Sequence, residues 1–160
     1  MPIQVAVCGP RHCTDEDTTR AYEVGRLLAR AGAVVICGGG TGVMAAAAAG
    51  ARAANGLVIG IRPHDTAGDA CPDLSAVIVT NLGEARNAVI VWSADAVIAI
   101  GGSWGTLSEI ALAKRRGTIP VITLGGWTVL AHDGTPLPDP TTPAATAQHA
   151  VALALARGEP

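Results

Sequence analysis

The chain has almost no aromatic residues. It contains no phenylalanine, one tyrosine and three tryptophans among 160 residues, yet 49% of its residues are hydrophobic. Small aliphatic side chains must therefore fill its core, which excludes a core built around large rings. A chain of this length can bury one sizeable core, so we expect a single α/β domain over residues 1–160.

The chain also lacks an excess of charge of either sign. It has 11 Lys and Arg against 13 Asp and Glu, so bulk electrostatics favour neither nucleic acid nor a membrane surface as a partner. Residues 1–9 show no basic segment ahead of an apolar one, and the run of small residues 43–54 is interrupted by Gly50 and Arg52. We therefore expect a cytoplasmic protein with no signal peptide and no membrane span.

Lysine is the scarcest of the charged residues. Lys114 is the single lysine of the chain, so none stands beside a glycine-rich segment and a Walker-A loop is excluded. Schiff-base chemistry would have to use Lys114. That residue shares a helical face with Leu107, Ile110 and Ala111, so we expect it at the edge of a core-facing apolar stripe.

Paired cysteines are missing too. Cys8, Cys13, Cys37 and Cys71 show no CxxC spacing and no flanking histidine pattern, so we expect no metal site. We also expect no bound cofactor. Cys8 and Cys37 end apolar runs, which is typical of small buried residues. The pattern leaves open whether Cys13 is exposed and reactive.

Short β-rich runs alternate with helical patterns along the chain. Continuous apolar strands that alternate with helices predict a parallel sheet covered on both faces, here a Rossmann-like doubly wound domain. We expect a surface loop over the proline-rich residues 126–142 and a C-terminal helix over 143–156. The predicted strands cover 3–9, 33–38, 57–61, 76–80, 95–101 and 119–125, and the earlier helices cover 14–30, about 43–55, about 83–93 and the segment after residue 106.

Glycines gather where three of these strands end. Ligands of doubly wound sheets bind at the carboxyl ends of the strands, where glycine lets backbone N–H groups converge and a helix N-terminus favours an anion. A tight turn between strand and helix would by itself explain the glycines of one such loop. Two glycine-rich loops, each between a strand and a helix, favour a phosphate site. The segment "GGGTGV" does not fit the dinucleotide fingerprint, because Val43 occupies the position of the last glycine. The candidate ligand-binding residues are Gly9, Gly38, Gly39, Gly42, Met44, Gly101, Gly102, Ser103, Trp104, Gly105 and Thr106.

Glu109 and Arg86 each allow two interpretations. Thr106 and Glu109 have the spacing of an S/T-x-x-E capping box, which would make Glu109 part of a helix start. A carboxylate beside an anion site is electrostatically costly, however, so a catalytic role at the ligand is the alternative. Arg86 is either a solvated charge on a helix or a phosphate-binding guanidinium.

Taken in order, these motifs resemble the LONELY GUY (LOG) family, formerly labelled lysine decarboxylases. The resemblance rests on "GGGTGVM" (38–44), Arg86, "ADA" (94–96) and "GGSWGTLSE" (101–109), and it covers the chain from Val5 to about Leu124. It implies a Rossmann-like homodimer that hydrolyses the N-glycosidic bond of nucleoside 5′-monophosphates to free base and ribose 5-phosphate. The resemblance also implies that Arg86 and Glu109 carry catalysis and that the glycine–threonine loop holds the phosphate.

Three positions depart from the LOG pattern. Gly101 stands where the family has proline, Ser103 where it has its second glycine, and Asn87 where it has lysine. With these three residues, the chain more closely resembles a sister branch of short bacterial proteins that includes molybdenum cofactor carriers. That branch implies binding of a phosphorylated pterin without hydrolysis, as the alternative function.

Some assignments stay open at this level. The helical segment "EARNAVIVWSA" (84–94) is apolar nearly all round, which favours covering by a second copy, hence a homodimer. His12, His64 and Asp65 follow strands and either face the cleft or are ordinary exposed loop residues. Trp104 either stacks on a ligand ring or packs under the loop.

Overall fold

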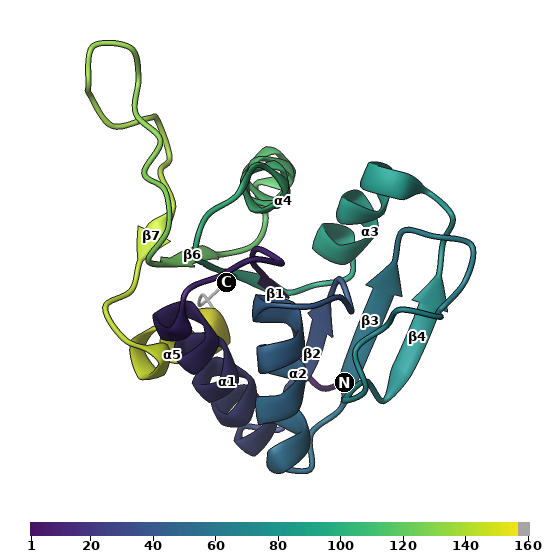
Figure 1. Ribbon diagram of the computed structural model, residues 1–160. Coiled ribbons are helices and arrows are strands. Elements are labelled where there is room, and N and C mark those ends of the chain that lie inside the picture. Colours follow the sequence, from purple (N-terminus) through teal and green to yellow (C-terminus); the bar gives the residue numbers. More distant parts are fainter. Residues whose placement is uncertain (157–160) are drawn as a thin grey trace.

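One parallel sheet of seven strands forms the centre of the molecule (Figure 1). The computed structural model describes residues 1–156. The strand order is β4-β3-β2-β1-β5-β6-β7, so the order reverses beside β1, which pairs with both β2 and β5. The strands are β1 (Gln4–Cys8), β2 (Val34–Cys37), β3 (Val58–Arg62), β4 (Ala76–Val79), β5 (Ala96–Ile100), β6 (Val121–Leu124) and β7 (Thr142–Pro143).

Helices cover both faces of the sheet, which confirms the Rossmann-like fold that the alternation predicts. Helices α1, α2 and α5 lie on one face, and α3 and α4 lie on the other. Thr14 caps α1 through the capping box with Asp17. The helices are α1 (Asp15–Arg30), α2 (Val43–Ala53), α3 (Arg86–Trp92), α4 (Trp104–Arg116) and α5 (Ala147–Leu155), with a short 3-10 turn at Gly83–Ala85 before α3.

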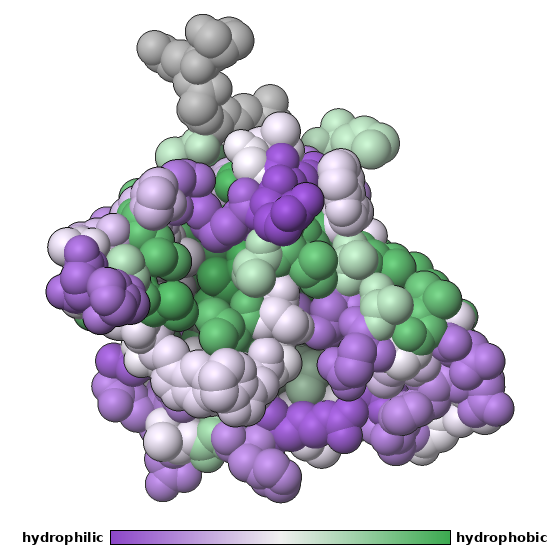
Figure 2. All heavy atoms as spheres, turned by 90° about the horizontal axis from the view of Figure 1, so that it is seen from above, coloured by the Kyte–Doolittle hydropathy of each residue, from purple (hydrophilic) through white to green (hydrophobic). Residues whose placement is uncertain are grey.

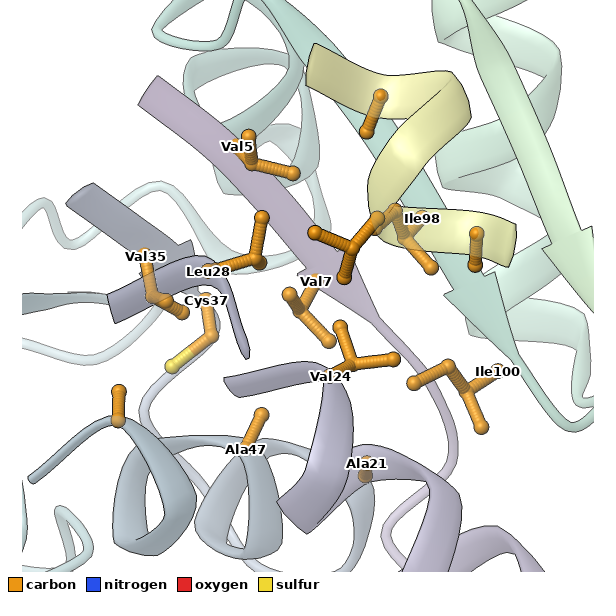
Figure 3. Packing of buried hydrophobic residues seen from close by; sticks show 14 of the residues in the cluster. Val5, Val7, Ala21, Val24, Leu28, Val35, Cys37, Ala47, Ile98 and Ile100 are labelled. Atoms are coloured by element: carbon orange, nitrogen blue, oxygen red, sulfur yellow. The ribbon is translucent and has the colours of Figure 1, made fainter. Parts of the chain in front are cut away.

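The core is made of small aliphatic side chains, as the composition requires. Figure 3 shows valines and isoleucines of β1, β2 and β5 meeting Ala21, Val24 and Leu28 of α1. Helices α1 and α2 approach so closely that a Cβ on Gly50 would lie 1.9 Å from the carbonyl oxygen of Tyr22. Glycine and alanine at this contact therefore let the two helices pack closely in a core that has no large aromatic rings.

The C-terminal segment differs from its prediction. The helix begins at Ala147 rather than at residue 143, because Thr142–Pro143 pairs with β6 as a short strand and Thr146 caps α5. Before β7, residues 126–141 form an extended arm that reaches away from the sheet (Figure 1). An isolated antiparallel bridge between Leu130 and Pro136 joins the two sides of this arm.

None of the helices within residues 1–156 combines the length and the hydrophobicity that crossing a membrane requires. In the same part of the chain, no cluster of three or more His, Cys, Asp or Glu side chains could hold a metal ion.

Candidate functional site

A cavity of about 450 Å³ opens at the carboxyl ends of the strands, beside the point where the strand order reverses. Figure 2 looks down on this end of the molecule. In doubly wound folds, this switch point is where ligands bind. The cavity is lined by Gly9, Pro10, Arg11, His12, Met44, Glu84, Arg86, Asn87, Gly102, Ser103, Gly105, Thr106 and Glu109.

The loop after β5 builds one wall of this cavity. Gly101 leaves the strand with a φ of +70°, a conformation that glycine adopts without strain. The Ser103 side chain then accepts a hydrogen bond of 3.1 Å from the Thr106 N–H and caps α4, which begins at Trp104. The predicted capping box between Thr106 and Glu109 is therefore wrong, since both residues lie inside the helix.

Glu109 projects from the inner face of α4 into the cavity. Only 8% of its surface is exposed, and burial raises the pKa of its carboxyl to about 7, against the opposing effect of the nearby Arg86 charge. At neutral pH this carboxyl group is therefore divided between its protonated and ionised forms. Such a group can donate or accept a proton at the same pH.

Arg86 starts α3 and is anchored beneath the cavity. Its guanidinium donates to the carbonyl oxygen of Gly38 at 3.0 Å and to that of Ile61. Burial lowers the pKa of Arg86, and the Glu109 charge acts in the opposite direction. Within residues 1–156, the buried Nε of Arg86 has no hydrogen-bond partner. The half-buried guanidinium thus supplies a fixed positive charge at the cavity.

The glycine turn after β2 supports the cavity from below. Gly39 and Gly42 have φ values of +67° and +68°, and the Val43 N–H donates to the carbonyl oxygen of Pro10 at 3.1 Å. Arg62, which is 1% exposed, donates to the Gly38 carbonyl oxygen at 3.3 Å and forms an ion pair with Asp69. Two arginines therefore converge on the carbonyl group of Gly38 and hold this turn in place.

The structure brings eight of the thirteen predicted site residues to the lining of this cavity. Gly38, Gly39 and Gly42 lie in the supporting turn, and Gly101 lines a neighbouring cavity. Trp104 is 78% exposed and meets Trp127 edge to face, with ring centres 5.1 Å apart. The predicted residues that line the cavity are Gly9, Met44, Arg86, Gly102, Ser103, Gly105, Thr106 and Glu109.

Other lining residues were not predicted as site residues. Asn87 is buried and donates a hydrogen bond of 2.9 Å to the Ser108 hydroxyl. That hydroxyl in turn donates to the Gly105 carbonyl oxygen at 2.7 Å, so the two hydrogen bonds join α3 to the first turn of α4. His12 lines the cavity, whereas His64 and Asp65 are exposed outside it. The other lining residues that were not predicted are Pro10, Arg11 and Glu84.

Cys8 and Cys37 end β1 and β2 and are buried, as their positions after apolar runs predict. Burial, with the nearby Glu109 charge, raises the pKa of Cys8, and burial raises the pKa of Cys37 to about 12. Both are therefore neutral thiols at physiological pH. Cys13 and Cys71 are half-buried.

Fold and site together define a Rossmann-like domain with a ligand cavity at the switch point of its sheet. The chain belongs to the SLOG cluster4 family, whose sequence profile matches residues 2–151. A protein of Archaeoglobus fulgidus with uncharacterized function is 46% identical over 116 residues, which cover 72% of this chain and 76% of that protein.

Several solved structures share both fold and sequence with this chain, among them two proteins that bind the molybdenum cofactor. The molybdenum cofactor binding protein from Rippkaea orientalis is 36% identical, with a TM-score of 0.87, over 96% of this chain and 95% of that one. The molybdenum cofactor carrier protein from Chlamydomonas reinhardtii is 29% identical, with a TM-score of 0.78, over 95% of each chain. The structural neighbours of this chain thus include molybdenum cofactor binding and carrier proteins.

Proposed function

We propose that this protein binds a phosphorylated pterin, such as the molybdenum cofactor, and carries it chemically unchanged. The observation that carries the proposal is the cavity at the switch point, which combines a capped helix N-terminus, an anchored arginine and a buried carboxyl group. The likeness to molybdenum cofactor proteins over nearly the whole chain supports the same assignment.

The phosphate of the ligand would lie against the first turn of α4. Gly102, Ser103, Gly105 and Thr106 line this end of the cavity, where the N-terminus of α4 and its helix dipole favour an anion. Arg86, which lines the same cavity, adds a positive charge. Glu109 would meet the flat ring, because a carboxylate accepts two N–H bonds from an aminopyrimidine edge such as that of a pterin.

Phosphoribohydrolase activity is the second candidate, because Arg86 and Glu109 line one cavity. A carboxyl group with a pKa of about 7 could stabilise positive charge on a ribosyl ring or activate water. Asn87, which stands where the LOG pattern has lysine, is however occupied in tying α3 to α4. The carrier proposal therefore assigns Glu109 to binding.

Incubation with a panel of nucleoside 5′-monophosphates separates the two candidates. A carrier is expected to release no free base from any of them, because nothing in its function requires the N-glycosidic bond to break. Chromatography of the mixtures measures base and ribose 5-phosphate directly, with the parent nucleosides as controls. Base release from a monophosphate, lost in Glu109→Gln, would instead establish the hydrolase.

We also propose that the protein is a homodimer. Ile90 and Val91 of α3 pack on the sheet, so the fold itself covers part of that apolar helix, but Trp92 is 67% exposed. All four residues of the edge strand β4 are exposed, including Val77 to Val79. Such apolar surface at one end of the sheet favours association.

Sedimentation at micromolar concentration is expected to show a species of twice the chain mass of 16.0 kDa. A single species at the chain mass, unchanged on concentration, would contradict the dimer.

A further inference from the structure

A second cavity of about 630 Å³ lies between α4 and the arm. Leu107 and Ile110 of α4 form one side, and Leu130 and Leu137 of the arm form the other. In the view of Figure 2, hydrophobic residues gather around a hollow on this face of the molecule. The apolar stripe of α4 thus lines this groove, with Ile110 also packed against the core, and the proposed function assigns nothing to the groove.

The groove adjoins the candidate phosphate site. Gly102, Ser103 and Thr106 line both cavities, so the loop after β5 and the start of α4 form their common wall. A phosphate group on this wall would have space on each side, about 450 Å³ toward Glu109 and about 630 Å³ toward the arm. Each volume lies in the range of small-molecule sites, roughly 300–1,000 Å³.

The lining of the groove suits a flat ring next to the phosphate. Trp127 is 46% exposed and packs against the loop so closely that a Cβ on Gly102 would lie 2.5 Å from its ring. Its edge-to-face contact with Trp104 fixes the indole beside the shared wall. At the far end, Lys114 and Asp139 form an ion pair of 2.7 Å that joins α4 to the arm and limits the length of the groove.

We propose that the groove holds the second heteroaromatic group of a two-part ligand, a dinucleotide whose pyrophosphate lies across the shared loop. The pterin-like ring would occupy the cavity of Glu109, and a nucleoside base would lie on Trp127 between α4 and the arm. This inference rests on the proposed function and narrows its ligand from a monophosphate to a pyrophosphate-linked dinucleotide.

Two flavins test the inference, because flavin mononucleotide and flavin adenine dinucleotide share a pteridine-type ring and differ by one adenylate. The dinucleotide is expected to bind the protein at least about tenfold more tightly, measured by calorimetry or flavin fluorescence, because only its adenine reaches the groove. Ala111→Trp fills the groove from an exposed position of α4 and is expected to remove this difference. Leu130→Glu, which enters the groove from the arm, is expected to do the same.

Ala152→Trp is the matched control, since Ala152 is an exposed alanine within α5 and lies outside both cavities. It is expected to leave the tenfold difference intact. Equal affinity for the two flavins would overturn the dinucleotide inference while the proposed function stands. Binding of neither flavin would also overturn the dinucleotide inference, whereas the proposed function stands or falls with binding of the molybdenum cofactor itself. A change of sedimentation in Ala111→Trp with no change in flavin preference would show that a second copy occupies the groove, which also overturns the inference.

Discussion

Replacing Glu109 by glutamine is expected to stabilise the protein by about 3 kcal/mol above pH 7. Burial raises the pKa of this carboxyl from its ordinary 4.5 to about 7, so the folded state holds the proton over a pH range in which the unfolded state has lost it. The free energy of unfolding therefore falls as pH rises from about 4.5 to about 7, by roughly 1.4 kcal/mol per pKa unit. Glutamine keeps the shape of the side chain and removes the ionisation.

Urea denaturation of both proteins between pH 4.5 and 8.5 measures this effect. The two stability curves should lie close together at the acid end and separate as the pH approaches 7, with glutamine the more stable above it. Curves that run parallel over the whole range would show that Glu109 ionises freely in the folded protein, and its assignment to a water-poor site would then be wrong.

Gly105→Val is expected to reduce affinity for a phosphorylated ligand by about 100-fold while the fold is retained. A Cβ at Gly105 meets only the Ser103 hydroxyl, at 3.8 Å, so a side chain can be attached at this position of the cavity lining without a clash at its Cβ. There it covers backbone N–H groups at the start of α4. Losing two hydrogen bonds to a charged group costs about 3 kcal/mol, which corresponds to that loss of affinity.

Gly68→Val provides the matched control. Its Cβ likewise meets a single atom at 3.8 Å, the Thr66 hydroxyl, and it is exposed outside the cavity. Titration of both variants with a phosphorylated ligand, beside thermal denaturation, separates binding from folding. Equal affinity in Gly105→Val and Gly68→Val would mean that the phosphate lies elsewhere.

The arrangement of the sheet could be predicted from the sequence because its strands are continuous apolar runs. Each of the first six lies within two residues of its predicted bounds. Five of them are mostly buried and therefore have no polar face, and the exposed edge strand β4 is still a continuous apolar run. The short β7 was missed. Its two residues carry no strand pattern, and they pair with β6 only because the arm returns to that edge.

The start of α4 shows where local patterns mislead. Thr106 and Glu109 satisfy the spacing of a capping box. Ser103 precedes Thr106 by the same spacing, however, and it is Ser103 that caps the helix. Glu109 therefore lies within α4, on its buried face, and lines the same cavity as Arg86. Sequence periodicity could not show this. Leu107, Ile110 and Ala111, the stripe that we expected to face the core, line the groove beneath the arm, and Ile110 packs against the core as well.

Arg62 is the clearest supporting residue that sequence reasoning missed. It directly ends the apolar strand β3, and a charged residue at the carboxyl end of a strand is a signal of the switch-point region. Its burial beneath the Gly38 turn, however, depends on the return of the loop that carries Asp69. Contacts of this kind between distant segments have no local pattern.

Titration of the purified protein with the intact molybdenum cofactor tests the central claim most directly. Anaerobic equilibrium dialysis, followed by oxidation and pterin fluorescence, measures both the amount bound and its chemical state. The account predicts one cofactor per chain, recovered unchanged, with binding weakened about 100-fold in Gly105→Val and preserved in Gly68→Val. Absence of binding to the wild-type protein, or recovery of a cleaved pterin, would contradict it.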